Sequence, residues 1–276
     1  MLVTDAQVHV WAPETPERPW PPPATRPRPQ GPPFSAEELL ERMLPAGVDR
    51  AILVPPSFEG DRNDFCLAAA AAHPDRFRVM GRIDLTDPSG AAAVAGWRDN
   101  PGMLGVRLTF GFGESMNWLR DGTCEWFWAA AEAANVPVML YPPGFLPEVA
   151  DVAERHPGLR LVLDHLAVHP RFRDEQVDPE LDELVKVAKF ANIAVKATCV
   201  PSLTSEEYPF PSLRDRVRRV VDAFGPRRVF WGSDLTRLPC DYRQAVTHFT
   251  EELTFLDGED LELVMGKAVS DWLGWT

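Results

Sequence analysis

Eight short runs of apolar residues recur along the chain, and longer stretches with helical patterning separate them. The runs are rich in Val, Leu and Ile, which is typical of strands that are buried on both faces of a parallel sheet. We therefore predict eight strands. They lie within residues 2–10, 51–56, 77–85, 103–110, 136–143, 159–167, 192–200 and 228–235.

The intervening stretches predict helices, and Ser35 with Glu38 forms a capping box in front of the first of them. The predicted helices cover residues 36–45, 62–73, 88–99, 123–135, 146–156, 178–191, 211–224, 241–255 and 258–273. Eight strand–helix units in series favour a closed barrel over an open doubly wound sheet. The predicted fold is therefore a single α/β domain over residues 1–276, a (β/α)8 TIM barrel.

A proline-rich segment interrupts this pattern directly after the first predicted strand. Ten of the 28 prolines fall between Pro13 and Pro33, where they exclude both a helix and a central strand. The segment joins no two domains, which favours a stiff inserted loop over a disordered linker. Trp11, Trp20 and Phe34 offer it apolar anchors, and its position predicts a cover over the carboxyl ends of the strands.

The charge balance narrows the class of partner. The chain carries 41 acidic against 28 basic residues, a formal charge of −13, which argues against nucleic acid and anionic membranes. The absence of a leader pattern, of a membrane-length apolar run and of paired cysteines predicts a cytoplasmic protein. The C-terminal DWLGW, residues 271–275, needs a packing partner for its two tryptophans, either the barrel or a second copy in a homodimer.

Polar residues recur at the ends of the predicted strands, where barrels of this kind carry their active sites. A single polar residue in a strand is more often structural than catalytic. Burial of a polar group is costly, however, so a set of them in register predicts a functional site. The set comprises Gln7, His9, Ser57, Arg82, Arg107, Tyr141, Asp164, His165, Lys196, Asp234 and Arg237.

The order of the motifs DAQVHVW, GVR, DH, VK and FWGSD resembles the amidohydrolase superfamily, and more narrowly its amidohydrolase-2 branch. That branch holds lactonases such as 2-pyrone-4,6-dicarboxylate lactonase and sugar-lactone hydrolases. It also holds metal-dependent decarboxylases of the aminocarboxymuconate-semialdehyde type. The resemblance covers nearly the whole chain, about residues 2–275. It implies a TIM barrel and a hydrolase of the lactonase kind.

Two departures from the family pattern bear on a metal ion. Metal-binding members open with His-x-His, whereas this chain has Gln7, a poor ligand for a transition metal, in front of His9. Where the decarboxylases supply a histidine from strand 5, this chain has Tyr141. We expect no required metal, as the resemblance to the lactonases implies. A single divalent ion such as Zn²⁺ would be held by His9, His165 and Asp234.

Without a metal, a carboxylate must activate the attacking water. The resemblance places the catalytic aspartate of the family at Asp234, which we expect to act as general base. His9 and His165 are expected to hold the substrate carbonyl, or Asp234 itself, by hydrogen bonds. The expected substrate is a small cyclic ester with an anionic group. Candidate substrate-binding residues are Arg107, Tyr141, Lys196, Arg82, Gln7, Arg237 and Ser57.

Two rival functions stay open on the sequence. The first is a metal-dependent, non-oxidative decarboxylase, which needs a bound divalent ion to hold the carboxylate. The second is a barrel without catalytic activity that binds a ligand. The presence of Asp234, His9 and His165 together favours an enzyme over this second alternative.

Overall fold

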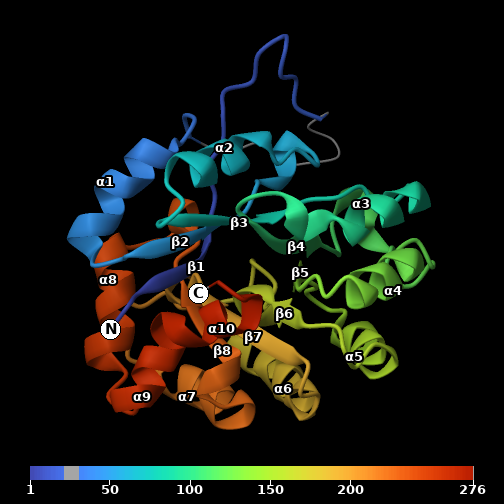
Figure 1. Cartoon of the computed structure of the whole chain (residues 1–276). Coiled ribbons are helices and arrows are strands. Elements are labelled where there is room, and N and C mark those ends of the chain that lie inside the picture. Colours follow the sequence, from blue (N-terminus) through green and yellow to red (C-terminus); the bar gives the residue numbers. More distant parts are fainter. Residues whose placement is uncertain (22–30, 276) are drawn as a thin grey trace.

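The eight predicted strands are present and form one parallel sheet in the order β1 to β8. The computed structural model describes residues 1–21 and 31–275. Figure 1 shows the strands at the centre of the molecule, and the helices surround them, as in a (β/α)8 TIM barrel. The strands are β1 (Thr4–Val8), β2 (Arg50–Leu53), β3 (Phe77–Gly81), β4 (Met103–Thr109), β5 (Val138–Tyr141), β6 (Leu161–Leu163), β7 (Ile193–Thr198) and β8 (Val229–Gly232).

The helices follow the predicted order, and the capping box of Ser35 and Glu38 is present at the first. They are α1 (Ala36–Ala46), α2 (Asp64–Ala72), α3 (Ala91–Ala95), α4 (Glu125–Ala133), α5 (Leu146–Arg155), α6 (Asp178–Lys186), α7 (Leu213–Phe224), α8 (Tyr242–Thr247), α9 (Gly258–Glu262) and α10 (Ala268–Leu273). Within residues 1–21 and 31–275, none of the helices has the length and apolar character needed to cross a membrane.

The prediction of one continuous helix over residues 258–273 is wrong. A π-helical segment, Leu263–Lys267, separates α9 from α10. At Gly266 the chain passes so close to the start of β1 that an added Cβ would lie 2.5 Å from the carbonyl oxygen of Leu2. This close approach interrupts the regular helix, and the sequence pattern alone does not reveal it.

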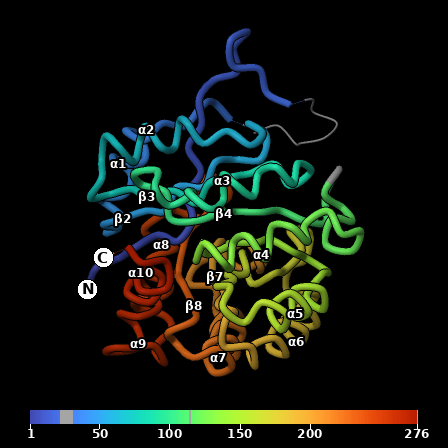
Figure 2. The backbone as a smooth tube through the Cα atoms, turned by 45° about the vertical axis from the view of Figure 1, so that its right-hand side comes forward, coloured from blue at the N-terminus to red at the C-terminus, as the bar shows by residue number. Residues whose placement is uncertain are grey.

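The C-terminal helix closes the amino end of the barrel. Apolar residues from the strands form an inner cluster, and Leu273 and Trp275 pack against it. The guanidinium groups of Arg50 and Arg78, at the starts of β2 and β3, lie 5.0 and 5.4 Å from the Trp275 ring. The C-terminal tryptophans therefore have a packing partner within the chain. In Figure 2 both termini lie on the same side of the molecule.

The central part of the predicted proline-rich loop, residues 22–30, lies outside the described residues. Its two flanks are held together by the backbone N–H of Trp11, which donates to the carbonyl of Phe34 over 3.0 Å. The rings of Trp11 and Trp20 pack on Phe58, with centroid distances of 5.6 and 4.8 Å. The flanks are thus anchored to the segment that follows β2.

Candidate active site

Three of the predicted site residues converge at the carboxyl ends of the strands. His9 follows β1, His165 follows β6 and Asp234 follows β8. Nε2 of His9 lies 3.2 Å from Oδ1 of Asp234, and Nε2 of His165 lies 3.7 Å from Oδ2. The side chain of Asp234 is fully buried, whereas His9 keeps 13% of its side chain exposed. The structure therefore brings together the predicted catalytic group.

The backbone adopts the left-handed conformation directly after three of the strands. The φ angles are 53° at His165, 55° at Cys199 and 50° at Asp234, after β6, β7 and β8. Residues other than glycine adopt this conformation at a cost of about 1–3 kcal/mol, and such strain clusters at functional sites. The surrounding structure must therefore hold these turns in place.

The Gln7 amide lies between the two imidazoles. Its Nε2 is 3.2 Å from Nε2 of His165 and 3.4 Å from Nε2 of His9, which places Gln7 and His9 on the same side of β1. Its Oε1 accepts a hydrogen bond from the ammonium of Lys196. Because Gln7 is completely buried, its polar atoms serve contacts within the protein.

Arg107 and Lys196, two of the predicted substrate-binding cations, bind a carboxylate of the protein itself. Nε of Arg107 lies 3.0 Å from Oδ2 of Asp164, and Nζ of Lys196 lies 2.7 Å from Oδ1. Burial would raise the pKa of Asp164, but the two cations outweigh it and lower that pKa. Burial lowers the pKa of Lys196, although Asp164 opposes this. Asp164, one of the polar residues predicted at the strand ends, therefore pairs with two cations of the protein.

Tyr141 uses its hydroxyl within the protein. The hydroxyl donates to the backbone carbonyl of Val168 over 2.7 Å, and the ring meets that of His165 edge-on with centroids 5.1 Å apart. Burial raises the pKa of Tyr141 above its usual range. In this arrangement the phenol supports the ring of His165, and its proton is not directed at a substrate.

The three remaining candidates differ in their access to solvent. Arg82 is buried and donates from Nε to the carbonyl of Pro55 over 2.6 Å. Ser57 is half-buried at the start of the short 3-10 turn after β2. Arg237 has 51% of its side chain exposed, and its guanidinium lies 3.7 Å from Oδ2 of Asp234. Arg237 is therefore the exposed cation next to Asp234.

Sequence reasoning missed Asp5, which holds the turn that carries Asp234. Its buried carboxylate accepts from the backbone N–H groups of Gln7 (3.0 Å) and Ser233 (2.8 Å), from the Ser233 hydroxyl, and from the Tyr242 hydroxyl (2.7 Å). Burial raises the pKa of Asp5 to about 6, and these hydrogen bonds oppose the rise. The signal that could have revealed Asp5 in the sequence is a carboxylate placed within a predicted apolar strand.

The electrostatics of the site keep Asp234 ionised and His165 neutral near pH 7. Burial alone would raise the pKa of Asp234, but His9, His165 and Arg237 lower it below its usual range. Burial lowers the pKa of His165 to about 4, against the pull of the nearby carboxylates. Oδ1 of Asp234 is within hydrogen-bond distance of Nε2 of His9, and among the described residues Oδ2 has no hydrogen-bond partner. The site thus presents a buried, ionised proton acceptor.

The residues around Asp234 do not fit a metal ion. In the described part of the chain, no group of three or more His, Cys, Asp or Glu side chains is arranged to hold one. The Gln7 amide nitrogen, which carries hydrogens, faces Nε2 of both His9 and His165. The ammonium of Lys196 lies directly behind it and would repel a cation.

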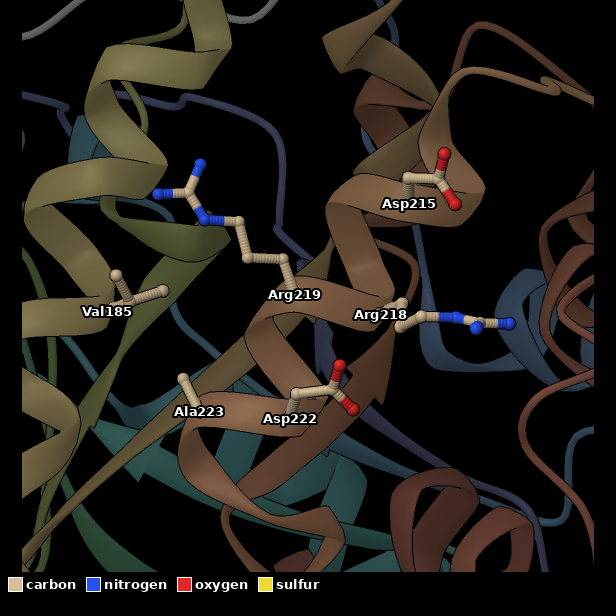
Figure 3. Close-up of a pocket in the computed structure, with 6 residues that line it drawn as sticks. All are labelled: Val185, Asp215, Arg218, Arg219, Asp222 and Ala223. Atoms are coloured by element: carbon tan, nitrogen blue, oxygen red, sulfur yellow. The ribbon is translucent and has the colours of Figure 1, made fainter.

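A pocket of about 540 Å³ lies on the outside of the barrel, between α6 and α7. Figure 3 shows the aspartate and arginine side chains of α7 that surround it. It contains none of the predicted site residues. Its lining residues are Val185, Asp215, Arg218, Arg219, Asp222 and Ala223.

Comparison with known proteins agrees with the predicted fold and family. The sequence model of the amidohydrolase family matches residues 4–268. The chain therefore belongs to the amidohydrolase family, and it is a hydrolase.

The chain also resembles individual proteins of known name or structure. The chain is 30% identical over 236 residues to L-fucono-1,5-lactonase of Burkholderia ambifaria, covering 83% of this chain and 79% of the relative. It is 28% identical over 240 residues to 4-sulfomuconolactone hydrolase of Hydrogenophaga intermedia, covering 83% and 73%. A zinc-bound amidohydrolase structure from Burkholderia multivorans superposes with a TM-score of 0.80 at 20% identity, covering 99% of both chains, which shows a shared fold.

Proposed function

We propose that this protein is a lactone hydrolase that opens a cyclic ester bearing an anionic group, with Asp234 as general base and without a required metal ion. Two relatives support the reaction class, because their names describe a lactonase and a sulfomuconolactone hydrolase. The donor set around Gln7 supports the metal-independent form, because an amide nitrogen and an ammonium stand where metal ligands would be needed.

The observation that carries the proposal is the state of Asp234. Its carboxylate is buried and ionised, Oδ1 faces Nε2 of His9, and among the described residues Oδ2 has no hydrogen-bond donor. A water molecule that donates to Asp234 is activated for attack on the lactone carbonyl carbon, and the carboxylate takes its proton. The ring C–O bond then breaks, and the proton passes to the departing alkoxide oxygen. The product is a hydroxy acid, with all atoms of water retained.

His9 is the histidine best placed to meet the substrate, because its side chain is partly exposed. Its Nδ1 donates to the carbonyl of Val54 over 2.7 Å, which leaves Nε2 as the nitrogen that exchanges a proton. Nε2 lies 3.2 Å from Asp234, so it can receive the proton from the carboxylate and hand it to the leaving oxygen. His165 borders Asp234 on the other side.

The exposed guanidinium of Arg237 is the group we assign to the anionic part of the substrate. It lies 3.7 Å from Asp234, which is close enough to hold a charged substituent near the reacting ester. A guanidinium binds carboxylate and sulfonate oxygens through paired N–H donors. Arg107 and Lys196 are already bound to Asp164 and have a structural part in this scheme.

A substrate panel tests the reaction class. Neutral sugar-1,5-lactones and unsaturated lactones with a carboxylate or sulfonate would be assayed by acid release in weak buffer. Aromatic carboxylic acids would be assayed in parallel by CO2 release. We expect lactone opening, with the highest kcat/KM for an anionic lactone. Release of CO2 without lactone opening, or the absence of turnover on every substrate, would contradict the proposal.

A further inference from the structure

Lys196 fixes the orientation of the Gln7 amide. The ammonium is completely buried, and among the described residues it contacts Oδ1 of Asp164 at 2.7 Å, Sδ of Met139 at 3.3 Å and Oε1 of Gln7. An ammonium has three hydrogens and no acceptor. The atom of Gln7 that faces it must therefore be the carbonyl oxygen, and the NH2 group must point the other way, toward the histidines.

This orientation determines the tautomer of His165. The Gln7 NH2 group donates to Nε2 of His165 over 3.2 Å, so that nitrogen carries no proton. The proton of the neutral ring then lies on Nδ1, which donates to Oγ1 of Thr198 over 2.7 Å. The same oxygen accepts from the backbone N–H of His165 over 3.2 Å. One set of hydrogen bonds thus runs in a single direction from Lys196 to Thr198.

We propose that Lys196, Gln7 and Thr198 form a positioning relay that keeps the proton off Nε2 of His165 and thereby maintains Asp234 as a base. This role rests on the proposed function of Asp234. Oδ2 of Asp234 lies 3.7 Å from Nε2 of His165 and has no hydrogen-bond donor in the part of the chain that the structure describes. In the opposite tautomer, an Nε2–H would point at this oxygen. A donor to the carboxylate stabilises its charged form and weakens it as a proton acceptor.

Gln7→Glu tests the relay with little change in size. The new carboxylate still accepts from Lys196, but its second oxygen faces His165 as an acceptor. The ring of His165 should therefore move its proton to Nε2. The readout is the ¹⁵N NMR spectrum of protein labelled on histidine, which distinguishes protonated from unprotonated ring nitrogens. The signals of His165 are assigned by their loss in His165→Asn, and Gln176→Glu, on the exposed turn before α6, is the matched control.

We expect wild type and Gln176→Glu to show His165 protonated on Nδ1 alone, and Gln7→Glu to show it protonated on Nε2. An Nε2-protonated His165 in wild type, or the same tautomer in both proteins, would overturn the relay.

Thr198→Val serves if Gln7→Glu does not fold, because it removes the acceptor of Nδ1 in an isosteric side chain. Because the Gln7 NH2 group still faces Nε2, His165 should keep its proton on Nδ1, and a shift of the proton to Nε2 would count against the relay. The NMR measurement requires no substrate. Failure of the lactonase proposal therefore leaves this test intact and can be distinguished from failure of the relay.

Discussion

At the scale of single residues, the pairing of charges decides which cations are available to a substrate. Asp164 binds both Arg107 and Lys196, and it is fully buried with them. A buried ion pair that loses one partner leaves an uncompensated charge, which is strongly destabilising. Arg107 and Lys196 are therefore held by Asp164 within the protein. The exposed Arg237 is the cation next to Asp234.

Arg237→Gln should separate anionic from neutral substrates. Loss of a hydrogen-bonded charge pair is worth about 1.5–3 kcal/mol, so KM for an anionic lactone should rise roughly tenfold or more. KM for a neutral sugar lactone should change by less than about twofold, because no charge is lost from that complex. Steady-state kinetics on both lactones provide the measurement.

Arg243→Gln is the matched control, because Arg243 is an exposed arginine of α8 that lies near Glu251 and not near Asp234. It should leave both KM values unchanged. An equal rise for both lactones in Arg237→Gln, or no rise for either, would show that Arg237 does not bind the anionic group.

The residues that the sequence predicted well are those whose place follows from their strand. His9, His165 and Asp234 each end a strand, and parallel strands bring such positions together. The partner of a charged residue does not follow from its own strand. Asp164 follows β6, whereas Arg107 is on β4 and Lys196 is on β7, so their pairing appears only once the barrel closes.

At the scale of elements, the contact between β1 and β8 positions Asp234, the proposed base. The backbone N–H of Asp234 donates to the carbonyl of Gln7 over 3.0 Å, and the Asp5 carboxylate binds the preceding Ser233. The pairing of β1 with β2 is irregular between Asp5 and Val8, and such irregularities re-aim side chains near active sites. Asp5 and Ser233 are 228 residues apart, which hid their contact from sequence reasoning.

Asp5→Asn should destabilise the fold through this contact. The amide replaces an acceptor oxygen with an NH2 group that must face a donor, which leaves buried polar groups unsatisfied. We expect a loss of about 1–3 kcal/mol in the free energy of unfolding at pH 7, measured with urea. Tyr242→Phe, which removes one of the hydrogen bonds, should cost less. Equal stability of Asp5→Asn and wild type would contradict this role for Asp5.

The difference in unfolding free energy between wild type and Asp5→Asn should depend on pH. The pKa of Asp5 is raised from 3.8 to about 6 in the folded protein, so the folded state binds the proton more tightly than the unfolded state. Lowering the pH from 6 to 4 therefore stabilises wild type through this group, by up to about 3 kcal/mol. Asparagine lacks this contribution. The stability difference between the two proteins should widen in that range, and a constant difference would show that Asp5 is not shifted.

At the scale of the whole molecule, the charge of the chain and the charge of the site have opposite signs. The chain carries a net −13, yet Arg107 and Lys196 lie at Asp164, and Arg237 lies at Asp234. A locally positive site in an acidic protein raises the local concentration of small anions. This distribution agrees with the proposed anionic lactone, and the overall composition alone did not reveal it.

The barrel as a whole could be predicted because each of its eight units repeats one local pattern. The closure of its amino end could not. The C-terminal segment turns back at Gly266 against β1 and places Trp275 under the strands, and this contact depends on a close backbone approach. Nothing in the local pattern of residues 258–273 distinguishes this broken helix from a continuous one.

Metal removal is the whole-protein test of the metal-independent form. Elemental analysis of the purified protein should find no stoichiometric zinc or manganese, because the Gln7 amide and the Lys196 ammonium do not accommodate a cation. Dialysis against a chelator should leave kcat on the lactone substrate unchanged. A bound ion at one per chain, with activity lost on its removal and restored on its return, would contradict this expectation.

The proposed role of Asp234 as general base is decided by kcat of Asp234→Asn on the best lactone of the panel. General base catalysis contributes about 10²–10⁴-fold, so kcat should fall by at least about 100-fold. The circular dichroism spectrum should stay that of wild type. Asp222→Asn, an exposed change on α7, should retain full activity. A rate for Asp234→Asn within about threefold of wild type would contradict the account.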